Sequence, residues 1–211
     1  MTMKRLIIVA LVALMGVVAL PTTASAQFDL SKIGGLFGGS SSKTTKSPYA
    51  TLAENAPQKS QVLGVWKYSS ICVEYLGTSA FADASVSQLN TFANTELKEA
   101  GIVPGCFTIK LQSNGKGSLS YEDMVYEGSY TYDSAKARFV LTVVTDDGKT
   151  LSCNGFLKIV NGKLGMMVKA EDALNAVSVA APELRADSTF LMIQGVVDSF
   201  SGIYLTLYCG R

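Results

Sequence analysis

The feature that most constrains this sequence is a run of short β-prone segments between residues 107 and 169, separated by turn residues. Asn114-Gly115 and Asn161-Gly162 are dipeptides that favour tight hairpins, because both residue types tolerate positive φ angles. Links this short join only antiparallel neighbours in a sheet. The pattern therefore predicts an antiparallel up-and-down meander.

Alternation along these segments gives the predicted sheet one apolar face and one mixed face, as expected for a sheet that curls around its own core. Gly155, in the middle of one segment, predicts a β-bulge that bends the sheet toward closure. The apolar face contains Phe107, Ile109, Leu111, Phe139, Leu141, Val143, Leu151, Cys153, Leu157, Ile159, Leu164, Met166 and Val168.

Another strand is predicted over residues 63–75, around the single tryptophan of the chain. Period-2 alternation places Trp66 and Tyr68 on one face, followed there by Ser70 and Cys72, with Lys67 on the other face. Trp66 is equally compatible with an ordinary core position in a β-sandwich.

The last strand is predicted over residues 203–209, which brings the total to about eight. An even number of alternating strands returns the last one antiparallel to the first, so residues 204–208 are expected to pair with residues 64–70. The predicted fold is mainly β: an eight-stranded antiparallel up-and-down barrel with two or three accessory helices.

Three segments show helical character. Residues 82–100 carry an apolar stripe and are expected to cover one mouth of the barrel. Residues 171–179 form a short second helix. Residues 188–199 are apolar on nearly every side, which predicts a buried helix, and Asp187 is its expected N-cap.

The first 26 residues have the layout of a secretory signal: Lys4 and Arg5, an apolar run to Leu20, and a small-residue site ending at Ala26. The alternative, a membrane-spanning anchor, is disfavoured because the apolar run is shorter than the ~20 residues that a span requires. The sequence thus predicts an exported protein, periplasmic or secreted, with no integral membrane span after cleavage. Residues 27–60 are rich in glycine and serine and are expected to be a flexible tether, and residues 61–211 form the barrel domain.

Charge gives no reason to expect a nucleic-acid partner. Removing the leader leaves 16 of the 18 basic residues against 17 acidic ones, a net charge of −1. An integral outer-membrane barrel is also disfavoured, because Glu127, Ser129 and Thr131 lie on the outward face of their strand.

Four cysteines enter an oxidising compartment if the leader is cleaved on export. The best disulfide candidate is Cys72 with Cys106, at the end of the first strand and the start of the second. The alternative is four free buried thiols. Their spacing matches no metal-ligand pattern, and the chain contains no histidine, so neither a metal nor another cofactor is predicted.

The absence of histidine also removes the usual general base and the usual partner of a nucleophile. Two carboxylate pairs, Glu122/Asp123 and Asp146/Asp147, lie in turns and are interpreted as solvated loop residues. No catalytic residue is predicted, and the protein is expected not to be an enzyme.

A ligand would have to enter the barrel, where inward aromatic residues could form an apolar pocket with a few hydroxyl groups. The alternative is that the same rings fill the interior, since eight strands enclose a space that side chains can occupy completely. The first hypothesis is a binding module for a small hydrophobic ligand, and the second is a structural or protein-interaction module with a filled barrel. The candidate ligand-binding residues are Trp66, Tyr68, Met124, Tyr126, Tyr130, Tyr132, Phe139 and Met166.

Three segments carry a family resemblance: residues 63–68 (LGVWKY), the helix ending at Gly101 with the following IVPGCF, and residues 128–133 (GSYTYD). Over about residues 61–210 the chain resembles an uncharacterised exported bacterial family described as lipocalin-like. The resemblance implies an eight-stranded barrel with added helices, in Gram-negative bacteria, with no assigned activity. True lipocalins are matched only at Gly64-Val65-Trp66, with no arginine on the last strand, so ligand transport is not implied.

Overall fold

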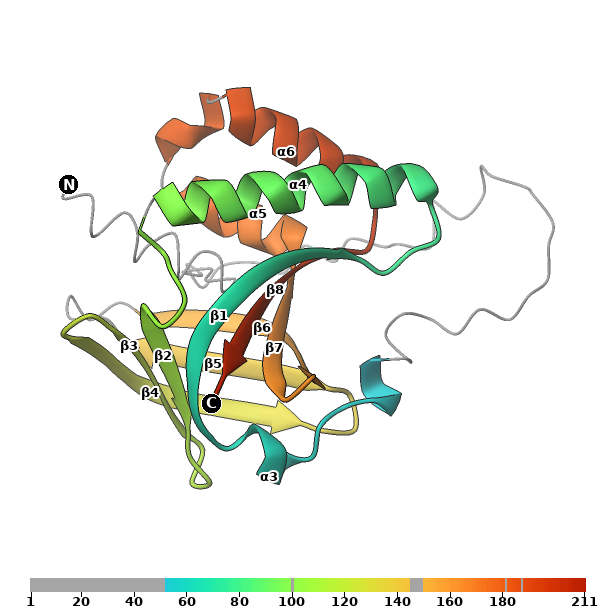
Figure 1. Ribbon diagram of the computed structural model, residues 1–211. Helices are drawn as coiled ribbons and strands as arrows, with labels where there is room; N and C mark the ends of the chain where they lie inside the picture. The colour runs from blue at the N-terminus through green and yellow to red at the C-terminus, as the bar shows by residue number, and fades with distance from the viewer. Residues whose placement is uncertain (1–51, 100, 145–149, 181, 187) are drawn as a thin grey trace, which may run out of the picture.

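The computed structural model describes residues 52–99, 101–144, 150–180, 182–186 and 188–211 (Figure 1). The predicted signal peptide and residues 27–51 of the predicted tether lie outside these ranges, as do Asp146, Asp147 and Asp187.

Eight strands form a closed antiparallel barrel in simple chain order, which confirms the predicted fold class. The strands are β1 (Gly64–Tyr75), β2 (Phe107–Leu111), β3 (Lys116–Tyr121), β4 (Met124–Asp133), β5 (Arg138–Val144), β6 (Thr150–Val160), β7 (Lys163–Lys169) and β8 (Ile203–Gly210).

The barrel closes where β8 pairs with β1, as predicted, but the pairing is offset along β1. Gly64–Lys67 pairs with β2, whereas Lys67–Tyr75 pairs with β8. Tyr204, for example, lies opposite Glu74. Strands in a closed barrel are tilted and staggered, so the two ends of one long strand pair with different neighbours.

The predicted face alternation of β1 fails after Tyr68, because the register shifts between Tyr68 and Ser70. Trp66 and Tyr68 are buried as predicted, but beyond the shift Ile71 and Val73 are the buried residues. A bulge inserts one residue and thereby exchanges the two faces of a strand.

The second half of β1 has an edge that β2 does not cover, and helix α4 (Ala80–Glu99) lies along it. The Val73 N–H donates to Asn90 Oδ1 at 2.6 Å, and Asn90 Nδ2 donates to the Val73 carbonyl at 2.7 Å. The Asn90 side chain thus supplies the pair of hydrogen bonds that a neighbouring strand would make.

The two predicted hairpin dipeptides differ in conformation. Asn161 and Gly162 both have positive φ, 52° and 75°, as a two-residue hairpin turn requires. In the other turn Gly115 alone has a positive φ, of 81°, and Asn114 Oδ1 accepts a hydrogen bond from the Lys116 N–H at 3.0 Å. Both turns join antiparallel neighbours as expected.

The bulge predicted at Gly155 is absent, because Gly155 pairs with Phe139 in unbroken register with its neighbours. Gly155 instead allows the main chains of β6 and β7 to lie close together, because a Cβ atom here would lie 2.2 Å from the Met167 carbonyl oxygen. The strand changes partner at this point, pairing with β5 up to Phe156 and with β7 from Phe156 onward.

Three helices lie together over one end of the barrel, and a short helix lies at the other end (Figure 1). The upper group is α4, α5 (Ala170–Ala180) and α6 (Ser188–Ser199), with a 3-10 helix η2 (Pro182–Ala186) between the last two. Leu97 of α4 and Ala173 of α5 pack on the barrel core, which agrees with the prediction that α4 covers a mouth. The lower helix is α3 (Lys59–Val62).

The prediction that α6 is buried holds for one side of the helix. Phe190 and Val197 are buried, but Leu191 and Met192 are 52% and 56% exposed. The helix lies on the outside of the helical layer, so the barrel and α5 cover one face at most. Among the described residues, none of the helices combines the length and apolar character needed to cross a bilayer.

The described part of the predicted tether contacts the barrel. Pro57 is buried, and its carbonyl accepts a hydrogen bond from the Tyr132 hydroxyl at 2.7 Å. In α3, Val62 is fully buried in the same core as Trp66. Residues 57–62 therefore close the lower mouth of the barrel.

We expect Gly155→Ala to lower the free energy of unfolding by about 1–3 kcal/mol, because the added methyl overlaps the Met167 carbonyl. Gly195→Ala is the matched control: nothing lies within 4 Å of its Cβ position, and alanine in a helix interior should stabilise by about 0.5–1 kcal/mol. Urea unfolding followed by circular dichroism measures both. Equal midpoints for Gly155→Ala and the wild type would contradict the close approach.

Candidate functional site

The interior of the barrel, where the sequence places a ligand, is a continuous apolar cluster drawn from all eight strands. Six of the eight predicted ligand-binding residues are buried members of this cluster: Trp66, Tyr68, Tyr126, Tyr130, Phe139 and Met166. The other two, Met124 and Tyr132, are partly buried and pack against it. The predicted residues are thus brought together, and they are packed on one another.

Aromatic contacts fill the centre of the cluster. Tyr68 stacks on Phe107 with the ring centroids 4.8 Å apart and an interplanar angle of 20°. Tyr130 and Phe139 lie 6.2 Å apart in a tilted arrangement. Contacts of this kind belong to a packed protein interior.

Polar atoms of these rings bond to the protein itself. Trp66 Nε1 donates to the Val62 carbonyl at 2.7 Å, and the Tyr130 hydroxyl donates to the Gln112 carbonyl at 2.8 Å. The Tyr126 hydroxyl contacts Met124 Sδ at 3.2 Å. These polar atoms are bonded to other groups of the protein and hold the lower end and the strands together.

Burial also sets the protonation state of the interior. It raises the pKa of Tyr68 to about 12, with a further contribution from Cys106 and Cys209 nearby, and raises the pKa of Tyr132 to about 12, with a contribution from Asp133. Both phenols are therefore neutral at physiological pH. These rings therefore carry no charge inside the barrel.

An arginine that the sequence analysis missed closes the lower end. Arg211 follows β8 directly, and its guanidinium lies 4.8 Å from the centre of the Trp66 ring. Its Nη2 donates to the Gln61 carbonyl at 3.2 Å. No arginine lies on the last strand, but the residue immediately after that strand places a cation over the tryptophan ring.

All four cysteines are free in the structure, and the predicted Cys72–Cys106 disulfide is not formed. The two cysteines lie beside different parts of β1: the Gly105 N–H donates to the Tyr68 carbonyl at 2.7 Å, so the chain at Cys106 meets β1 at Tyr68, before Cys72 is reached. Cys106 packs on the barrel core close to Tyr68 and Cys209, whereas Cys72 lies near Glu74 and Lys158. Cys209 thus lies close to Cys106 as well as to Tyr68.

A polar network ties the outer wall together across β1, β6 and β8. Lys158 Nζ forms an ion pair with Glu74 Oε2, and the Tyr208 hydroxyl donates to Glu74 Oε1 at 2.6 Å. Lys158 Nζ also lies 5.4 Å from the centre of the Tyr208 ring. Gly165 leaves room for both side chains, since a Cβ atom there would lie 3.0 Å from Lys158 Cγ. Both charged groups of this network are paired, which indicates that the network stabilises the wall of the barrel.

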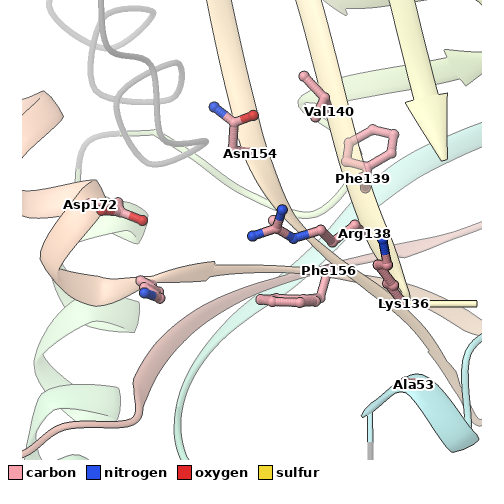
Figure 2. Close-up of a pocket in the computed structure, with 10 residues that line it drawn as sticks. Ala53, Lys136, Arg138, Phe139, Val140, Asn154, Phe156 and Asp172 are labelled. Carbon is pink, nitrogen blue, oxygen red and sulfur yellow. The ribbon is translucent and has the colours of Figure 1, made fainter. Parts of the chain in front are cut away.

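The described residues form a hollow outside the barrel, with a volume of about 600 Å³. It lies against the outer face of β5 and β6, below the start of α5, and Figure 2 shows the side chains around it. We call it the outer groove and define it by its lining residues: Ala53, Lys136, Arg138, Phe139, Val140, Asn154, Gly155, Phe156, Lys169 and Asp172.

The register of two strands builds the floor of the outer groove. Arg138 lies opposite Phe156, and Val140 lies opposite Asn154. Arg138 and Val140 face outward because they alternate along β5 with the buried Phe139 and Leu141, and successive residues of a strand point to opposite faces. In Figure 2 the Arg138 and Phe156 side chains project into the same space, and Asp172 faces them from α5.

Strand alternation with Phe139, which is predicted to face inward, makes Arg138 an outward residue, but no role was predicted for it. One signal in the sequence could have indicated this site. Phe156 is an aromatic residue on the otherwise polar face of its strand, and it lies opposite Arg138 on the partner strand. Lys169 and Asp172 come to the same groove from the junction where β7 continues into α5. Strand periodicity does not reveal that position.

The carboxylate pair Glu122/Asp123 is exposed in the β3–β4 turn, as predicted, and Asp146/Asp147 lies outside the described residues. Within the described ranges, histidine, cysteine, aspartate and glutamate side chains form no group of three that could hold a metal ion.

Comparison with known proteins gives one match over most of the chain. The model of the lipocalin-like domain family DUF4923 matches residues 40–209. A DUF4847-family protein of solved structure from Bacteroides vulgatus ATCC 8482 is 14% identical, with 43% of this chain and 90% of that chain covered and a TM-score of 0.21, which carries no argument about fold. None of the curated proteins matches the chain.

The cysteines give a test of the core. Burial raises the pKa of Cys153 and of Cys209 to about 12, so at pH 8 only about one in ten thousand of these thiols is ionised in the native state. We expect iodoacetamide at pH 8 to leave both unmodified in the folded protein. The same unreduced protein, unfolded in guanidinium, should gain four carbamidomethyl groups, as should a reduced control. Two labels in place of four would establish a disulfide and contradict the free thiols.

Proposed function

Since this chain belongs to the lipocalin-like domain family DUF4923, we propose that it is an exported, non-enzymatic binding protein. Its barrel serves as a solid scaffold, and its ligand binds in the outer groove. The observation that carries this proposal is the contrast between the two sides of β5: Phe139 and Leu141 pack into the core, and Arg138 and Val140 present their side chains to an open hollow of about 600 Å³.

Packing favours a filled barrel over a ligand inside it. The aromatic residues of the interior contact one another, and the polar atoms of Trp66 and Tyr130 are hydrogen-bonded to main-chain carbonyls. A ligand in the interior would have to displace these side chains, at the cost of the packing and hydrogen bonds that they make. The outer groove requires no such displacement, and its volume lies within the ~300 to 1,000 Å³ of typical ligand sites.

The lining of the outer groove supports binding without catalysis. Its described lining residues include three cations and two phenylalanine rings but no serine, cysteine or histidine, and Asp172 is the one carboxylate among them. Hydrolysis with two carboxylates requires a second acidic group nearby, and covalent catalysis requires an activated nucleophile. Export is supported by the leader of residues 1–26.

Ligand mapping by NMR tests the position of the site. A fragment library is titrated into isotopically labelled protein, and the chemical-shift changes are assigned to residues. We expect the changes to concentrate at Arg138, Asn154 and Phe156. Changes concentrated at Tyr130 and Met166 would instead establish an interior pocket and overturn the proposal.

Export is tested by expressing the whole chain in a Gram-negative host and measuring the molecular mass of the product in each cell fraction by mass spectrometry. We expect the periplasmic or secreted fraction to contain a form that begins at Gln27. Leu11→Arg, which interrupts the apolar run, should leave the precursor uncleaved in the cell. An unprocessed wild-type chain retained in the membrane would contradict cleavage and support an anchor.

A further inference from the structure

The outer groove carries uncompensated positive charge. Lys136, Arg138 and Lys169 line it against a single carboxylate, that of Asp172. Lys136 is paired weakly with Asp133, at 3.7 Å between exposed side chains. Within the described residues, neither Arg138 nor Lys169 forms an ion pair. Among the described residues, these two cations are therefore available to an anion.

An apolar wall lies next to these cations. Phe156 is half-buried and makes an edge-to-face contact with Tyr204, with ring centroids 6.2 Å apart and an interplanar angle of 72°. Val140, on the neighbouring strand, is also half-buried. The ring is therefore held in place before a ligand arrives, and an apolar body can pack on it without a large loss of side-chain freedom.

From this arrangement we propose that the outer groove binds a small amphiphilic anion of the aryl sulfonate or aryl carboxylate type. Arg138 and Lys169 bind the acid group, and the apolar body packs against Phe156 and Val140. A guanidinium presents paired N–H donors that match the oxygens of such an acid. This inference names the ligand class for the site of the proposed function and rests on that function.

Size and charge argue against other occupants. The groove holds about 600 Å³, which suits one small molecule. A nucleic acid requires an extended basic surface, and the chain after the leader has a net charge of −1. Residues 27–51 carry Lys32, Lys43 and Lys46 against Asp29. This segment is therefore positively charged, like the groove, which argues against the segment as its occupant.

Two fluorescent probes that share a ring skeleton test the ligand class. 8-Anilinonaphthalene-1-sulfonate carries an acid group, and N-phenyl-1-naphthylamine is the same skeleton without it. We expect the sulfonate to bind at a single site, about tenfold or more tightly than the neutral amine, because charge-assisted hydrogen bonds contribute at least that factor. Raising the salt concentration should weaken the binding of the sulfonate but not the binding of the neutral amine.

The double variant Arg138→Gln/Lys169→Gln should weaken sulfonate binding by about tenfold or more and leave the amine unchanged. Lys67→Gln/Lys110→Gln is the matched control: both lysines are exposed on β1 and β2, and the net charge changes equally. Leu191→Ser/Met192→Ser removes the exposed apolar residues of α6 and should leave sulfonate binding intact. Thermal midpoints establish that each variant is folded.

The outcomes separate the two proposals. Equal binding of both probes, with NMR shifts still at Phe156, would overturn the anionic class and leave the groove as the binding site. Loss of sulfonate binding in the α6 variant, with no effect of Arg138→Gln/Lys169→Gln, would overturn the inference by placing the probe on α6. Absence of any probe from the groove by NMR would overturn both proposals.

Discussion

The pairing of β1 with β8 is the contact that converts an open meander into a closed wall. It joins Lys67–Tyr75 to Ile203–Gly210, segments more than 100 positions apart in the sequence. An open sheet of these strands would leave two edges of unpaired main-chain groups and an exposed apolar face. Closure buries that face as one core, and Trp66 and Arg211 come together at its lower end because the strands that carry or precede them are neighbours.

The length of β1 explains most of what surrounds the barrel. Because the strands are staggered, the second half of β1 extends past β2, and its free edge is covered by α4 through the Asn90 side chain. The register shift after Tyr68 sends Val73 toward the helices, where it joins the second apolar cluster. Cys72 lies in this second half of β1, whereas the chain at Cys106 meets the strand at Tyr68, so the expected disulfide is not formed.

The packed aromatic cluster inside the barrel is the reason that the proposed site lies on the outside. Side chains of β5 alternate between the core and the outer groove, so the residues that stabilise the fold and those available to a ligand are interleaved along one strand. Gly155 allows β6 to approach β7 closely at the floor of this groove. Arg138 and Lys169 are both exposed, so their side chains lie outside the packed core.

The sequence by itself determined the eight strands, their antiparallel order and most of the inward residues, because alternation and turn dipeptides are local signals that act over a few residues. Asn161-Gly162 and the alternation around Tyr126 and Tyr130 are of this kind. Tertiary structure alone decided the stagger of β1, the Asn90 edge contact, and the meeting of Arg138, Phe156, Lys169 and Asp172. These features depend on which distant segments become neighbours when the barrel closes, and the free energy of that packing is not a property of any short stretch of the chain.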